Sequence, residues 1–150
     1  MDKKILFTGI IVLAVFILTA GCTQSGTSSA NTGSTAVPST LSTPGPTQTL
    51  PIYWSVAVQV ASNGKAIDPQ IIMTFNGGNG MNLVQEIDMQ VTRTDGVVET
   101  GKLTQPLASG QTITLQGTTG NYDRAEVWVV TPQGDRVKII DQYVPFRQYH

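Results

Sequence analysis

Residues 86–92 read Glu-Ile-Asp-Met-Gln-Val-Thr, and this stretch decides the fold. Ile87, Met89 and Val91 point to one side of an extended chain, and Leu83 continues their parity upstream. The intervening positions, from Glu86 to Thr92, are polar. Strict alternation of this kind predicts a β-strand with one buried face and one solvated face.

The same period-two pattern extends in both directions from this stretch. Upstream, apolar positions alternate over 52–60 and 71–75; downstream, strands are predicted over 97–103 and around 113–115, 125–129 and 137–143. Turn signals separate them, among them Asn63-Gly64 and Asp95-Gly96. No segment carries a helical stripe. Residues 51–150 are therefore predicted to form one all-β domain, a seven-stranded antiparallel Ig-like β-sandwich that lacks the Ig disulfide.

The domain is preceded by a tract of low complexity. Half of residues 23–50 are Ser or Thr, three are proline, and none is charged. So few apolar side chains cannot offset the entropy lost on ordering, and residues 22–50 are predicted to be a lipid-bearing Cys22 followed by a disordered stalk.

The N-terminus has the layout of a secretion signal. Lys3 and Lys4 precede an apolar run, and Leu18-Thr19-Ala20-Gly21-Cys22 closes it. This closing motif resembles a lipobox, which implies removal of residues 1–21 and lipidation of Cys22. The expected location is extracytoplasmic, on the outer face of the cell membrane. Two alternatives stay open, an uncleaved transmembrane anchor and a type IV pilin leader.

Short motifs in the domain resemble those of a known group. Thr74-Phe75-Asn76-Gly77-Gly78, the turn 117–120 and the closing run 137–144 are similar to the β-sandwich of small archaeal, methanogen-type cell-surface proteins and pilin-like proteins. The resemblance implies a role at the cell surface and no defined activity. The N-terminus departs from the pilin pattern, since Ile5 directly follows Lys4.

The sequence offers no set of residues that points to catalysis. The lone histidine, His150, is the last residue, and Cys22 is the lone cysteine, so neither a hydrolase triad nor a Cys/His metal site can be drawn. Glu86 and Asp88 share one face and could join a Ca²⁺ site, but a solvated outer face is the simpler interpretation. No cofactor is expected, and an enzyme is the least favoured alternative.

The charge balance argues against nucleic acid as a partner. Without residues 1–21 the chain keeps 7 basic and 9 acidic residues, a net charge of −2. Nucleic-acid binding requires a concentrated basic surface, which this composition does not supply.

One strand breaks the alternation and supplies the candidate contact residues. In Val127-Trp128-Val129-Val130 both faces are apolar, so Trp128 requires a cover. The C-terminal aromatics Phe146 and Tyr149 could supply it, or a partner could. The favoured function is a membrane-tethered binding, adhesion or envelope-structural module with a surface-layer, glycan or protein partner; the alternative is a minor component of an archaeal pilus or secretion apparatus.

Overall fold

A computed structural model describes residues 41–147 of the chain. The predicted signal segment, Cys22, residues 23–40 of the predicted stalk, and Tyr149 lie outside the described residues. Among residues 41–147, no helix is long and apolar enough to cross a membrane.

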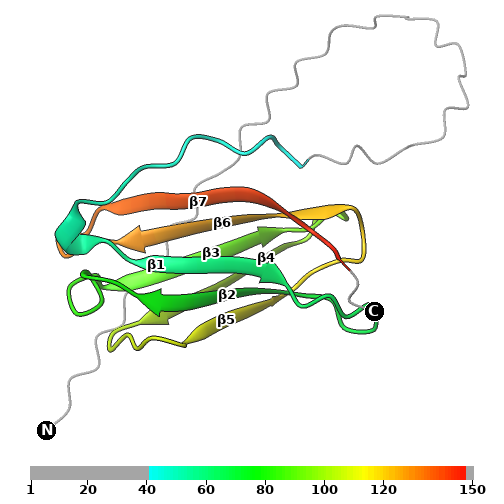
Figure 1. Cartoon of the computed structure of the whole chain (residues 1–150). Helices are drawn as coiled ribbons and strands as arrows, with labels where there is room; N and C mark the ends of the chain where they lie inside the picture. Colours follow the sequence, from blue (N-terminus) through cyan, green and yellow to red (C-terminus); the bar gives the residue numbers. More distant parts are fainter. Residues whose placement is uncertain (1–40, 148–150) are drawn as a thin grey trace, which may run out of the picture. The chain divides into compact units, whose positions relative to one another are not determined.

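The described chain is all-β, with seven antiparallel strands in two packed sheets (Figure 1). The strand orders are β1-β2-β5 in one sheet and β4-β3-β6-β7 in the other. The elements, in chain order, are η1 (Ile52–Trp54), β1 (Ala57–Ser62), β2 (Gln70–Gly77), β3 (Glu86–Thr92), β4 (Val98–Thr104), β5 (Thr112–Gln116), β6 (Tyr122–Val130) and β7 (Arg136–Pro145).

The core lies between the sheets and confirms the alternation seen within residues 86–92. Leu83, which the pattern placed on the same buried face, precedes β3 in a loop and is exposed, and Val84 is buried in its place. Ile87, Met89 and Val91 of β3 are almost fully buried. They neighbour Val127 and Val129 of β6, which are completely buried. Phe75 and Met73 of β2 face them from the other sheet, inside the same cluster of buried side chains. Each buried aliphatic side chain contributes roughly 1.5–3 kcal/mol, which stabilises this core without a disulfide.

The predicted first strand begins later than the sequence indicated. Residues 52–54 form the short 3₁₀ turn η1 after Pro51, and β1 starts at Ala57. The loop between β2 and β3 holds this turn in place, since Gly80 N donates to the carbonyl oxygen of Ser55 over 2.9 Å. Trp54, one of the alternating apolar positions over 52–60, is half-buried and packs against the core.

The folded part of the chain begins before residue 51, where the sequence placed the boundary. Residues 41–50 run along β7 towards η1 (Figure 1), and Gln48 N donates to the carbonyl oxygen of Lys138 over 2.8 Å. Leu50 is buried in the core. Composition alone indicated disorder here because the partners that hold this segment lie about ninety residues away in the sequence.

Candidate functional site

The outer face of the four-stranded sheet is polar, as predicted, and its charges are paired across strands. Lys102 Nζ lies 3.0 Å from a carboxylate oxygen of Glu86, and Arg136 Nε lies 3.0 Å from a carboxylate oxygen of Asp88. The hydrogen bond from Lys102 lowers the pKa of Glu86. Burial, helped by neighbouring Glu86, raises the pKa of Asp88.

A shallow hollow of about 440 Å³ lies beside these pairs. It is lined by both acidic residues, their two basic partners, and Met89, Gln90, Thr100 and Gly101. Its lining contains both hydrogen-bond donors and acceptors, which suits a polar ligand better than an apolar one. A Ca²⁺ ion at Glu86 and Asp88 would have to displace both basic partners.

Trp128 lies on the same outer face, opposite to its buried neighbours Val127 and Val129, as the sequence predicted. The Arg136 guanidinium stacks on the indole ring, 4.1 Å from its centroid, and Lys138 Nζ lies at 5.8 Å. These cations form cation–π contacts with the half-buried ring. The cover that the sequence required for Trp128 therefore includes two β7 side chains.

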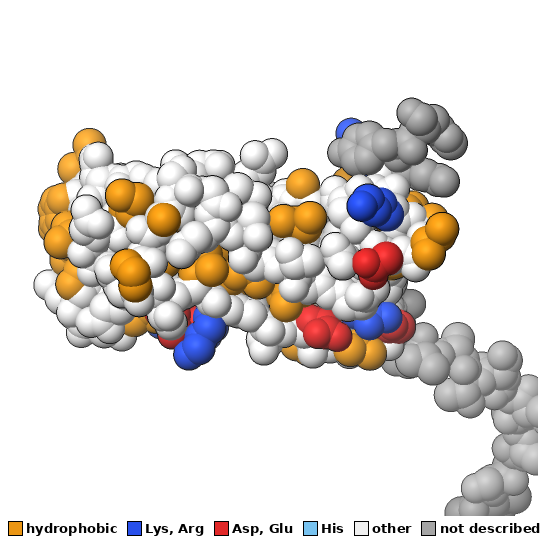
Figure 2. All heavy atoms as spheres, turned by 90° about the horizontal axis from the view of Figure 1, so that it is seen from below, with side chains coloured by type: hydrophobic (Ala, Val, Ile, Leu, Met, Phe, Trp, Pro, Cys, Tyr) orange, Lys and Arg blue, Asp and Glu red, His pale blue; other side chains and the backbone are white. Residues whose placement is uncertain are grey.

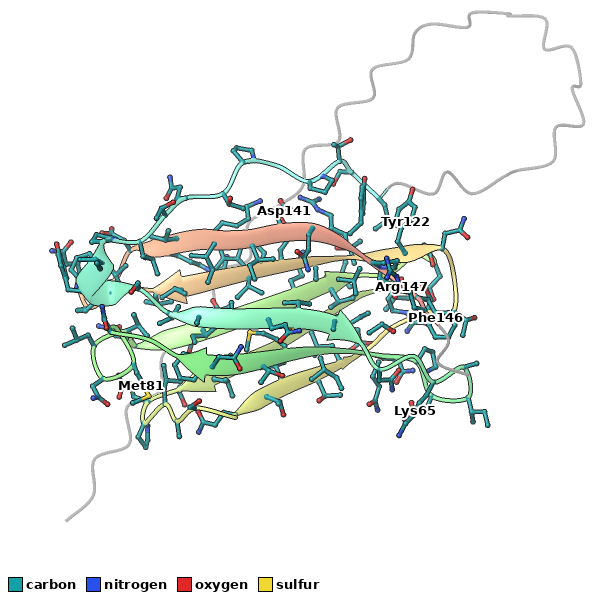
Figure 3. All side chains as sticks on the ribbon, viewed as in Figure 1. Lys65, Met81, Tyr122, Asp141, Phe146 and Arg147 are labelled. Carbon is teal, nitrogen blue, oxygen red and sulfur yellow. The ribbon has the colours of Figure 1, made fainter. Side chains whose placement is uncertain are left out.

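The structure does not bring Phe146 to Trp128. Phe146 follows Pro145, which pairs with Tyr122 at the first residue of β6. Trp128 lies six residues further along that strand, a distance of about 20 Å at 3.3 Å per residue. Figure 3 shows Phe146 near Tyr122, at the end of the sheets where β6 begins.

Four charged side chains further along this face form a largely buried cluster, here called the ionic cluster: Arg124, Glu126, Lys138 and Asp141. The Asp141 side chain is 0% exposed and accepts hydrogen bonds from Arg124 Nε (2.8 Å), Arg124 Nη2 (2.7 Å) and Lys138 Nζ (2.8 Å). The same two cations contact Glu126 at 3.1 and 3.0 Å. The cluster is electrically neutral, and its geometry includes a bidentate Arg–carboxylate pair.

These contacts favour the charged forms of Arg124, Lys138 and Asp141. The hydrogen bonds from Arg124 hold the pKa of Asp141 well below its ordinary range. Asp141 in turn raises the pKa of both Arg124 and Lys138. Arg124, Lys138 and Asp141 are therefore charged at neutral pH.

Sequence reasoning did not single out the ionic cluster. Arg124 and Glu126 share the parity of Trp128 in β6, which was a usable signal for an outer charged face. Lys138 and Asp141 do not share parity, because the β6–β7 register shifts between Val127 and Trp128. That irregularity turns both side chains to the same face, and the sequence does not reveal it.

One end of the domain is uncharged and exposes apolar side chains. Ile52, Tyr53 and Leu83 are 76%, 56% and 48% exposed, and we call this surface, with half-buried Trp54 and Met81, the apolar end. Residues 50–56, 76–85 and 105–111, which meet there, contain no charged residue. Figure 2 shows hydrophobic side chains gathered at this end, with most charged side chains on the visible face lying towards the other.

Hydrogen bonds and close backbone packing hold the apolar end together. Asn79 Nδ2 donates to the carbonyl oxygen of Ile52 over 3.1 Å, and Gln105 Nε2 donates to that of Val84 over 2.6 Å. A Cβ added to Gly80 would lie 2.3 Å from the carbonyl oxygen of Trp54, so the two backbones are in direct contact. The exposed side chains thus project from a fixed platform.

No group of three or more metal-ligating His, Cys, Asp or Glu side chains occurs within residues 41–147. Comparison with protein-family models, with curated proteins and with solved structures finds no match to this chain.

Proposed function

We propose that the protein is a membrane-tethered, extracytoplasmic lipoprotein whose β-sandwich acts as a binding or adhesion module. A lipid on Cys22 would hold it to the outer face of the membrane, and residues 23–40 would serve as the stalk. The strand orders support an Ig-like classification, because they match strands A-B-E and C′-C-F-G of such sandwiches.

The observation that carries this proposal is that the described chain begins at one end of the domain and the apolar end lies at the other. Ser42, near the start of the described chain, contacts Arg124 at the end that carries Tyr122. The apolar end lies at the other extremity of the sheets, as the positions of Met81 and Tyr122 in Figure 3 show. A tether that arrives at one end leaves the other end free to face a partner.

The composition of the apolar end supports a contact role. Interface cores are depleted of charge and enriched in aromatic residues and methionine. The opposite end also exposes Ile67 and Val97, but charged residues flank them there, including Lys65 and Asp95. A surface-layer protein or another envelope protein is the partner that this chemistry fits best.

The anchor is tested by intact-mass analysis of protein isolated from native membranes. We expect the chain to begin at Cys22 and to carry the additional mass of a lipid. A chain that still contains residues 1–21 would contradict the lipoprotein proposal and favour the transmembrane alternative.

The contact surface is tested by photo-crosslinking in intact envelopes. A photoreactive amino acid at position 53 is expected to give discrete crosslinked products, because Tyr53 lies in the apolar end. The same group at position 67 is the matched control, since Ile67 is fully exposed at the other end. Equal crosslinking at both positions, or none at position 53, would argue against the apolar end as the contact surface.

A further inference from the structure

Residues 41–49, here called the strap, lie along β7 without forming a strand of the sheet. Figure 3 shows the strap passing over the region of β7 that carries Asp141. It joins the described start of the chain to Leu50, so any load on the N-terminal side reaches the domain through it.

Polar contacts are the main attachment of the strap. Gly45 N donates to Asp141 Oδ2 over 2.9 Å, Arg124 Nη1 donates to Ser42 Oγ, and Gln48 N donates to the carbonyl oxygen of Lys138. Six strap residues are exposed: Ser42, Thr43, Pro46, Thr47, Gln48 and Thr49. Of its apolar residues, Leu41 and Pro44 are half-buried and Pro46 is exposed, and none belongs to the buried core. The hydrophobic free energy that holds the strap is therefore smaller than that which holds Leu50.

The attachment changes abruptly at the end of the strap. Leu50 is buried in the core, and η1 follows, locked against Gly80. Detaching Leu50 would open the core, whereas detaching residues 41–49 would not. Leu50 is thus the point at which local detachment stops.

The ionic cluster stays satisfied when the strap leaves. Asp141 keeps its three hydrogen bonds from Arg124 and Lys138, and Glu126 keeps its contacts with the same cations. Detachment removes a few hydrogen bonds and creates no unpaired buried charge, which would be the costly outcome. Segments with so few buried apolar contacts open locally at low free energy.

We propose that residues 41–49 are a releasable strap, which detaches from β7 as a unit while both sheets stay folded. Release adds nine residues to the proposed stalk, up to about 30 Å of reach when extended, and uncovers the outer edge of β7. The use of this length as slack in a tether rests on the proposed function, but release itself does not.

The test is native-state hydrogen exchange on the full chain at several low denaturant concentrations. We expect the amides of Gly45 and Gln48 to be protected, and to exchange through an opening that depends little on denaturant, because little surface is exposed. Amides of β3 should exchange only through an opening with strong denaturant dependence. The measurement does not depend on whether residues 1–21 are removed or Cys22 is lipidated. The strap proposal can therefore fail while the lipoprotein proposal stands, and the reverse.

Two matched variants sharpen the result. Ser42→Ala removes the contact with Arg124 and should accelerate exchange at Gly45 by about five-fold, leaving β3 unchanged. Thr47→Ala, at an exposed strap position, should change neither the exchange rate of the Gly45 amide nor that of the β3 amides. The proposal is overturned if Gly45 and Gln48 exchange together with β3, or if they show no protection, or if Ser42→Ala accelerates β3 equally.

Discussion

Asp141→Asn is expected to lower the free energy of unfolding by about 3 kcal/mol, because it removes one partner from a buried ion pair. Asp141 is fully shielded and balances Arg124 and Lys138. The amide would leave two cations facing Glu126 alone. Chemical denaturation followed by tryptophan fluorescence measures the loss.

The pH dependence of stability provides an independent check on Asp141. Its pKa is held below the ordinary value of 3.8 in the folded state, so its contribution is complete above about pH 5 and is lost as the pH falls below that value. Wild-type protein should therefore lose stability on acidification more steeply than the asparagine variant. Asp135→Asn, at an exposed position, should follow the wild type within about 0.5 kcal/mol. If stability falls in parallel with pH for the wild type and Asp141→Asn, the ionic cluster does not lower the pKa of Asp141.

The parts of the fold that depend on local alternation could be predicted from the sequence. The pattern predicts that Ile87, Met89 and Val91 share one buried face, and the structure confirms it. Trp128 lies on the face opposite to Val127, as the pattern also predicts. Seven strands were predicted, and seven are found within the described residues. Period-two patterning carries this information because it is a property of each strand separately.

The features that depend on distant partners could not be predicted. The strap has the composition of a disordered tract, and its course depends on contacts with Arg124, Lys138 and Asp141, far along the sequence. The ionic cluster required the register shift beside Trp128. The sequence also drew attention to Phe146 as a cover for Trp128, whereas Arg136 stacks on that ring. In each of these cases the contact partners are determined by how the two sheets pack and pair, which local sequence patterns do not encode.

The apolar end was missed for a related reason. The alternation over 52–60 predicts a strand that includes Ile52 and Tyr53, and in a strand Ile52 would face the core. The 3₁₀ turn η1 places both at the surface instead, and it depends on contact with the loop at Gly80. In the fold, the glycines of this loop allow close contact between backbones, which the sequence pattern does not reveal.

Gly80→Ala is expected to lower the free energy of unfolding by about 3 kcal/mol, because the methyl group has no space. The added Cβ would lie 2.3 Å from the Trp54 carbonyl oxygen and 2.5 Å from its carbonyl carbon. Both are backbone atoms, so rotation of a side chain cannot relieve the clash. The loop must therefore separate from η1, with loss of the hydrogen bond from Gly80 N to Ser55.

This separation has a local signature besides the loss of stability. In a Trp128→Phe background, Trp54 is the single tryptophan, and its emission should shift to the red in Gly80→Ala as η1 moves away from the core. Asn82→Ala, an exposed change in the same loop, is the matched control and should alter neither stability nor emission. If Gly80→Ala lowers stability without moving the Trp54 emission, the clash is relieved elsewhere and η1 is not fixed by this loop. If both change, the rigid platform beneath Ile52 and Tyr53 depends on the contact between Gly80 and Trp54, and crosslinking at position 53 should weaken in the same variant.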